Sequence, residues 1–253
     1  MSDYLFDIPY NFDKNLPSLF SEEDKKNINC FYFPPPSTMY NSVVRVDFQY
    51  KTLPKEKEAF SEHVKILNQF KSNSCKLLLQ KPDILIEKKE IEEYVKMGIR
   101  RFCVGSINQA MIIKSVDENL EVTASILMQV DEDLLKNYSI FKKYFDNIVL
   151  PFNYCNDINK VKSIAKNFPH FNYSIICNSL CSRSCRGLQH WLLPPDYKGN
   201  MNILCPDDRK TNSAFINPKD LKKYTNYIKN FKLVDRMMPS KQIYHQFKTY
   251  LGI

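Results

Sequence analysis

The chain has 253 residues, of which 43% are hydrophobic and 25% charged, and its net charge is +8. This composition excludes disordered and fibrous proteins, and the length is ample for one domain with a sizeable core. No apolar run approaches the ~20 residues of a membrane span, and the opening MSDYLFDIPYNF lacks the basic start of a secretion signal. We therefore expect a cytoplasmic protein whose cysteines stay reduced.

Short apolar segments alternate with amphipathic ones along the chain. Strands are predicted at Tyr4–Ile8, Asn29–Phe33, Lys76–Gln80, Arg101–Val104, Glu121–Met128, Asn147–Leu150, Tyr173–Cys177 and Phe231–Val234. Helices are predicted near Ser21–Lys26, Lys55–Lys71, Lys88–Met97, Asn108–Val116, Asp131–Phe145, Asp157–Asn167, Pro218–Ile228 and Ser240–Tyr250. Gly98 supplies a left-handed stop for the third of these helices, and Pro218 fits the first turn of its own.

Eight strands, each followed by a helix, predict a (β/α)8 TIM-type barrel. We expect residues 1–253 to form this barrel as a single domain. The stretch Val43–Gln49 does not fit the strand count, so the barrel is expected to be irregular near residues 34–54, with either an additional strand or an ordered loop.

The barrel prediction indicates where function lies, because catalytic groups collect at the C-terminal ends of the strands. The predicted seventh strand stops at Cys177, where the segment CNSLCSRSCRGLQHW begins. A cysteine-bearing loop over residues 177–217 is therefore expected at the mouth of the barrel. This placement follows from the strand count and is independent of the cysteines themselves.

Strand parity places further polar groups at the same mouth. In the last strand Lys232 and Arg236 share the face opposite Phe231, so they point into the lumen if the aromatic face meets the helices. The lumen would then suit a polar or anionic small molecule. The alternative is that Arg236 lies beyond the strand in solvent and that Lys232 reaches out of the lower end.

Four cysteines form the clearest chemical signal: Cys177, Cys181, Cys185 and Cys205. Structural zinc sites usually carry C-x2-C pairs, whereas this chain has C-x3-C-x3-C and a distant fourth cysteine. Thiolates at this longer spacing favour a 4Fe-4S cluster held by four cysteines, or by three with one open iron. Zinc and simple buried thiols remain the alternatives.

The remaining candidates are weaker. His190 is either a cluster ligand or acid–base group, or a surface imidazole. Cys75 and Cys103 lie at or in apolar strands and are expected in the core. Cys155 follows the sixth strand at the mouth and is ambiguous, and Cys30 is a reserve fourth ligand.

Several segments resemble the peptidase U32 (collagenase-like) family, especially its short single-barrel members. The opening LFDIPYNFDKNL is similar to the family's first strand and turn, and YSIICNSLCSRSC resembles its seventh strand. The tail FINPKDLKKY…FKLVDRMMPS is the most specific match. The matching positions are Asn178, Cys181, Cys185, Pro218, Asp220, Leu221, Tyr224, Lys232 and Arg236.

The resemblance implies a barrel that binds a 4Fe-4S cluster through four cysteines. It also implies oxygen-independent hydroxylation of ubiquinone precursors or RNA bases. Some members of the family work as pairs of related subunits. This chain departs from the family pattern: it has only Cys205 where a second cysteine pair is usual, Leu188 at a usual Arg, and Asp235 at a usual Gly. The fourth ligand is therefore left open between Cys177, Cys30, a non-cysteine group and an open iron.

Two functions follow as hypotheses. The first is an iron–sulfur enzyme or enzyme subunit that modifies a peptide, an RNA base or an aromatic metabolite, with Arg236, Lys232 and His190 as catalytic candidates. The second is a non-catalytic partner barrel with a structural cluster or zinc, which binds a peptide or a sister U32-type subunit. True proteolysis is not expected, because the sequence has no HExxH motif and no nucleophile beside an evident base.

Overall fold

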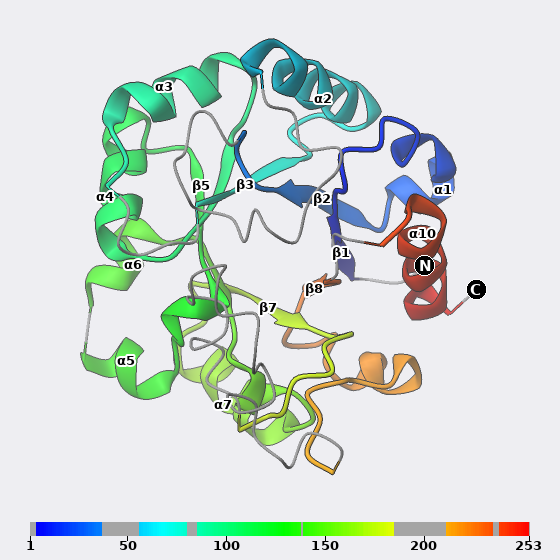
Figure 1. The fold of residues 1–253 in the computed structure, drawn as a ribbon. Helices are drawn as coiled ribbons and strands as arrows, with labels where there is room; N and C mark the ends of the chain where they lie inside the picture. Colours follow the sequence, from blue (N-terminus) through cyan, green and yellow to red (C-terminus); the bar gives the residue numbers. More distant parts are fainter. Residues whose placement is uncertain are drawn as a thin grey trace, which may run out of the picture.

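The computed structural model describes residues 4–36, 56–79, 85–137, 139–184, 211–234 and 238–252. Within these residues, eight parallel strands form a closed barrel in the order β1 to β8, and β8 pairs with β1 (Figure 1). The strands are β1 Leu5–Pro9, β2 Ile28–Phe33, β3 Cys75–Leu79, β4 Arg101–Val104, β5 Glu121–Ala124, β6 Asn147–Val149, β7 Asn172–Ile176 and β8 Asn230–Lys232. The predicted (β/α)8 barrel is confirmed.

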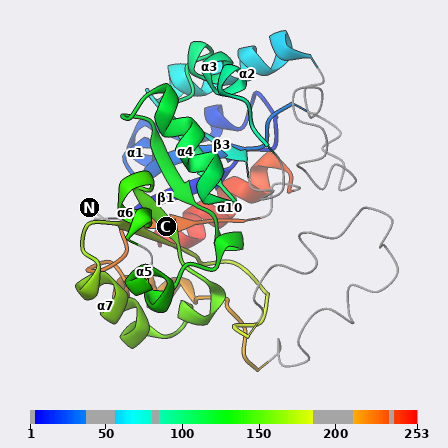
Figure 2. The same ribbon diagram turned by 90° about the vertical axis from the view of Figure 1, so that its left-hand side faces the viewer.

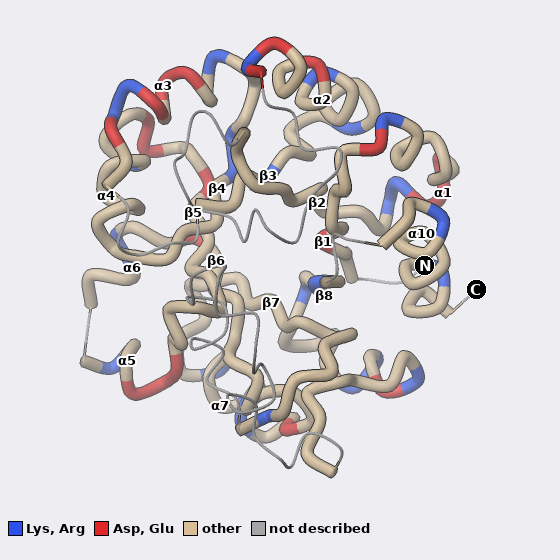
Figure 3. Tube along the Cα trace, viewed as in Figure 1, with Lys and Arg blue, Asp and Glu red and all other residues tan. Residues whose placement is uncertain are grey.

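Helical segments surround the strands in both views of the molecule (Figures 1 and 2). Charged residues of both signs lie along these outer segments (Figure 3). The α-helices are α1 Glu22–Lys25, α2 Lys57–Phe70, α3 Lys88–Lys96, α4 Ile107–Val116, α5 Glu132–Asn137, α6 Ile140–Tyr144, α7 Ile158–Asn167 and α10 Ser240–Leu251. The 3-10 helices are η1 Pro17–Leu19, η3 Ile126–Met128, η4 Phe152–Tyr154 and η6 Pro218–Lys223. None of the helices in this part of the chain is long and apolar enough to cross a membrane.

The main core lies between the outer face of the barrel and the helices. Helix α10 buries Phe247 against Phe6 of β1, with ring centroids 5.4 Å apart in an edge-on arrangement. Full burial of a side chain of this size contributes about 1.5–3 kcal/mol. Residues such as Phe6 and Phe231 therefore point outward, and the alternate residues Asp7 and Lys232 point into the lumen.

Strand β5 is shorter than predicted, because the chain turns into η3 directly after Ala124. The Ser125 hydroxyl accepts a hydrogen bond from the Leu127 backbone nitrogen at 3.3 Å, and Gln129 adopts a left-handed φ of 50°. Side chains such as Ser125 compete with strand pairing in this way. The predicted strand Glu121–Met128 is therefore wrong beyond Ala124.

The predicted helix at residues 131–145 is divided into α5 and α6. A continuous helix would carry the buried Leu135 and Phe141 on different faces, since they are six residues apart. The predicted helix from Pro218 is the 3-10 helix η6, in which Pro218 does occupy the first turn. Gly98 ends α3 with a φ of 96°, as expected. The irregularity expected near residues 34–54 falls largely outside the described residues.

Candidate functional site

The two ends of the cysteine-bearing loop lie side by side at the C-terminal end of β7. The Cys177 carbonyl accepts a hydrogen bond from the Ile216 nitrogen at 2.8 Å, and the Cys181 carbonyl accepts one from the Ala214 nitrogen at 2.7 Å. An antiparallel bridge joins Ser182 and Ser213. We call these two segments, residues 177–183 and 212–216, the loop base.

Hydrogen bonds of two side chains, Asn178 and Tyr250, hold the loop base against the barrel. The Asn178 amide nitrogen donates to the Val234 carbonyl at 3.0 Å and to Gln246 at 2.9 Å, and the Asn178 oxygen accepts from the Val234 nitrogen at 2.7 Å. The Tyr250 hydroxyl lies 3.0 Å from the Cys177 carbonyl oxygen. Asn178, one of the positions of the U32 resemblance, therefore joins the end of β7 to the segment after β8 and to α10.

Among the residues that the structure describes, three cysteine thiols lie at this end of the barrel. Cys177 and Cys155 are fully buried, and Cys181 is partly exposed. The Cys177 sulfur lies 3.6 Å from the Lys232 carbonyl oxygen, and the Cys155 sulfur lies 3.5 Å from the Ile176 carbonyl oxygen. Burial raises the pKa of Cys155 to about 12 and the pKa of Cys177 well above its ordinary value. Both are neutral thiols in this conformation.

The thiols are a donor set that suits soft metals. Thiolate sulfur selects iron–sulfur clusters and zinc, so the chemistry of Cys155, Cys177 and Cys181 fits such a group. Among the described residues, no three His, Cys, Asp or Glu side chains form a metal-binding group on their own. The other predicted site residues lie outside the described residues: Cys185, His190, Cys205 and Arg236.

Lys232 is the predicted catalytic residue that the structure does describe. It is 4% exposed, and its ammonium lies 4.3 Å from the centroid of the Tyr32 ring inside the lumen. Tyr32 packs with Leu78 and Cys103 in a small cluster separate from the outer core. Lys232 therefore does not reach solvent at the lower end, and Cys103 is buried as expected. Cys75 is also buried, in the outer core.

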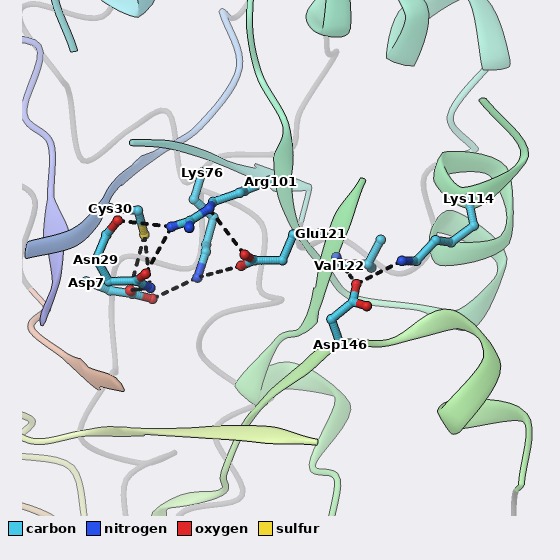
Figure 4. A network of polar contacts seen from close by, with 9 residues as sticks. All are labelled: Asp7, Asn29, Cys30, Lys76, Arg101, Lys114, Glu121, Val122 and Asp146. Atoms are coloured by element: carbon cyan, nitrogen blue, oxygen red, sulfur yellow. Dashed lines mark hydrogen bonds and ion pairs between the residues drawn. The ribbon is translucent and has the colours of Figure 1, made fainter. Parts of the chain in front are cut away.

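A buried ion pair occupies the lumen next to Lys232. The Lys76 ammonium lies 3.0 Å from the Asp7 carboxylate, and both residues are almost fully buried (Figure 4). The same carboxylate accepts hydrogen bonds from the Asn29 amide at 2.6 Å and from the Cys30 thiol at 3.1 Å. Cys30, the reserve cluster ligand, is thus engaged with Asp7.

Further polar contacts continue from this ion pair to the N-terminal rim of the barrel. The Arg101 guanidinium donates to the Asn29 carbonyl at 3.0 Å and lies 3.2 Å from the Glu121 carboxylate, which lies 3.7 Å from Lys76 (Figure 4). We call Asp7, Asn29, Cys30, Lys76, Arg101 and Glu121 the lumen network. These contacts close the lower part of the lumen with paired charges.

Electrostatics keep the Asp7–Lys76 pair ionised. Burial alone would raise the pKa of Asp7, but the Lys76 charge, the Asn29 hydrogen bond and the Lys232 charge together hold that pKa below its ordinary value. Burial opposes the charge on Lys76, but the neighbouring Asp7 raises the Lys76 pKa. The sequence signal for this pair was available: each residue is a lone charge in an apolar strand, LFDIP or CKLLL, and such charges require a partner.

A pocket of about 460 Å³ lies against the loop base. Asn178, Ser179 and Leu180, the residues between Cys177 and Cys181, line one side of it. Phe215, Pro218, Val234, Met238, Gln246, Thr249 and Tyr250 complete the wall. Leu180 is 75% exposed and Phe215 is 38% exposed. The pocket thus has an apolar rim beside the thiols.

Comparison with known proteins finds similar solved structures. No family model matches the chain, and no curated protein matches it. The solved structure of the U32 peptidase Mk0906 is similar, with a TM-score of 0.59 and 9% sequence identity over 93% of this chain and 94% of that chain. At this identity the likeness shows the fold alone. The resemblance to the U32 family is therefore confirmed at the level of the fold.

A second solved structure is more distant. The carboxyl transferase domain of Rhizobium etli pyruvate carboxylase, with pyruvate and biocytin, matches with a TM-score of 0.45 and 12% identity over 98% of this chain and 47% of that chain. This similarity is too low to carry an argument about function.

Proposed function

We propose that this chain is an iron–sulfur barrel protein of the U32 type, an enzyme or enzyme subunit that modifies a peptide, an RNA base or an aromatic metabolite at the C-terminal mouth. The observation that carries the proposal is the position of Cys177 and Cys181 at the end of β7, in a barrel that shares its fold with a U32 peptidase. The C-terminal face is where such barrels hold their reactive groups.

The proposed ligands are Cys181, Cys185 and Cys205, with a fourth thiolate from the loop base. Among the alternatives that the sequence leaves open, we choose Cys177, because the Cys30 thiol is engaged with Asp7. A bound cluster would supply redox-active iron, or an open iron that acts as a Lewis acid. The buried thiol of Cys177 would have to lose its proton before it could bind metal.

The protein's own side chains would position an anionic substrate. Arg236 carries a permanent charge and can hold a carboxylate or phosphate with two parallel hydrogen bonds. Lys232 already faces the Tyr32 ring and the Asp7 charge. We therefore assign the direct substrate contact to Arg236 and a supporting positive charge in the lumen to Lys232. His190 is the candidate acid–base group.

The test is metal analysis of anaerobically purified protein. We expect iron and sulfide in equal amounts, with the broad visible absorbance of an iron–sulfur cluster. Cys181→Ser should abolish both the iron and the sulfide. Cys103→Ser is the control: it also removes one thiol, but one that is buried in the lumen, and it should change neither. Stoichiometric zinc without sulfide would refute the cluster.

A second function is favoured by the apolar rim of the pocket. Exposed side chains such as Leu180 and Phe215 beside a pocket are typical of protein interaction sites. A non-catalytic barrel that binds a sister U32-type subunit or a peptide would use this rim. Co-purification of one identified U32-type chain, lost in Leu180→Glu while the metal content is unchanged, would favour this function over the enzyme.

A further inference from the structure

The turn that follows β1 contains a buried tyrosine–histidine pair. The Tyr10 hydroxyl lies 2.7 Å from Nδ1 of His63, a residue of α2, and both side chains are buried. The rings of Tyr10 and Phe12 meet the His63 imidazole edge-on, with ring centroids 5.7 Å and 5.4 Å away. A hydrogen bond and two aromatic rings therefore enclose the one type of side chain that ordinarily titrates near neutral pH.

Phe12 adopts an unfavourable backbone conformation in this turn. Its φ is 60°, in the left-handed region that a bulky residue rarely enters. Its buried side chain packs against Phe33 and Phe60 as well as against His63, with ring centroids 5.8 Å, 6.4 Å and 5.4 Å away. A strained conformation of this kind persists only where its surroundings hold it. The packing around His63 therefore keeps a strained turn in place.

The same turn holds the start of α10. The Asn11 amide nitrogen donates to the Met238 carbonyl at 3.0 Å and to the Ser240 hydroxyl at 3.1 Å. The Ser240 hydroxyl donates to the Asp13 carboxylate at 2.5 Å. We call residues 10–13 the β1 corner. Since Met238 and Ser240 belong to the segment that leads from β8 into α10, a change at the β1 corner reaches that segment directly.

Protonation of His63 opposes this arrangement. Burial raises the pKa of Tyr10, so the phenol keeps its proton and can donate it to Nδ1 of a neutral imidazole. In the imidazolium both ring nitrogens are donors, so the phenol loses this acceptor. Burial lowers the pKa of His63, the Lys14 charge lowers it further, and the Glu62 charge acts in the opposite direction. The charged and titratable groups around the pair are Asp13 and Lys14 after β1, Glu62 and Lys65 of α2, and Cys75 of β3.

We propose that His63 is an acid-sensitive latch, which holds the β1 corner against α2 and releases it when the imidazole takes up a proton. Release relaxes Phe12 and frees the segment between β8 and α10. Because the pKa of His63 is lowered in the folded state, the latch is fully closed above the ordinary value of about 6.5 and weakens as the pH falls below it. The inference goes beyond the proposed function and needs no cluster.

The test is hydrogen exchange of the full chain at about pH 7.5 and about pH 5.5, corrected for the intrinsic exchange rate at each pH. Because opening is linked to the uptake of one proton, the opening equilibrium constant of the β1 corner and α2 should rise by up to about tenfold at the lower pH. His63→Gln stays neutral at both pH values and should abolish this rise. His245→Gln, the control, removes an exposed histidine of α10 and should leave the rise unchanged. His63→Phe repeats the test if the glutamine variant does not fold.

Strand β5 separates a local latch from general acid unfolding, because it lies across the closed barrel from β1. A rise confined to the β1 corner, α2 and the first turn of α10 supports the latch. An equal rise in β5 overturns it, and so does a rise that His63→Gln leaves in place. Exchange of the wild-type β1 corner that does not change with pH also overturns it.

Discussion

The lumen network and the loop base occupy opposite ends of one barrel and treat their reactive groups in opposite ways. In the network, Asp7 and Lys76 are charged and satisfied by each other and by Asn29. At the other end, the buried thiols of Cys155 and Cys177 are neutral and contact backbone carbonyls. A buried thiol with a raised pKa is unreactive until it loses its proton. The lower end of the barrel is therefore held together by paired charges, and the upper end by neutral contacts with the backbone.

The largest expected effect tests the lower end. Asp7→Ala leaves the Lys76 ammonium buried without its main partner, so we expect a loss of about 3–5 kcal/mol in the free energy of unfolding. Urea denaturation measures this loss. The exposed ion pair of Glu22 with Lys25 is the matched control, and Glu22→Ala should cost less than about 1 kcal/mol. Equal losses in the two variants would contradict the expected difference between the buried and the exposed ion pair.

The next effect tests how the loop base is fastened. Asn178→Ala removes hydrogen bonds to both backbone groups of Val234 and to Gln246, and at about 1 kcal/mol each we expect a loss of roughly 2–3 kcal/mol. Asn137→Ala, which removes a single exposed hydrogen bond to the Asp133 carbonyl, should have little effect. If Asn178→Ala has the same free energy of unfolding as the wild type, the Asn178 hydrogen bonds do not stabilise the attachment of the loop base to the segment after β8 and to α10.

The two ends of the barrel should also lose their contributions to stability at opposite pH extremes. The Asp7 pKa is lowered in the folded state, so its contribution is present above an unfolded pKa of about 3.9 and is lost as the pH falls through the folded value. The pKa values of Cys155 and Cys177 are raised, so the metal-free protein loses stability as the pH rises above about 8.5, by about 1.4 kcal/mol per pH unit for each proton.

Urea midpoints across the pH range check this difference. Cys155→Ala and Cys177→Ala should each flatten the alkaline slope by up to one proton and leave the acid limb unchanged. The stability gap between Asp7→Ala and the wild type should instead narrow below about pH 4. An alkaline slope that neither cysteine variant alters would mean that these thiols do not stay neutral in the fold.

The smallest effect tests the corner after β6. Asn156→Gly keeps the left-handed backbone but removes the hydrogen bonds to Ser213 and Phe215, so we expect a loss of about 0.5–1.5 kcal/mol. Asn73→Gly is the control, because Asn73 has a similar φ of 54°, and it should change stability by only a few tenths of a kcal/mol. Thermal melts of the two variants side by side measure the difference.

The sequence predicted the barrel because every strand is a short apolar run with a helix behind it, and Arg101–Val104 was placed without error. It overextended β5, because apolar periodicity does not report that the Ser125 hydroxyl binds its own backbone. It placed both Cys177 and Cys155 at the mouth, but it did not predict that the corner after β6 contacts the segment 212–216, since that contact depends on long-range hydrogen bonds of Asn156. It missed the Asp7–Lys76 pair, which joins residues far apart in the chain.

The contact of Tyr250 with the loop base bears on the order in which the molecule is made. Its hydroxyl lies 3.0 Å from the Cys177 carbonyl oxygen and 2.9 Å from the Ile216 carbonyl oxygen. About 70 residues separate Cys181 from Tyr250, and a ribosome that adds roughly 5–20 residues each second needs several seconds to make them. The cysteines are therefore synthesised well before the residue that fastens them exists. During that interval the carbonyl of Cys177 lacks its contact with Tyr250, and translation itself sets the time before the loop base can be joined to α10.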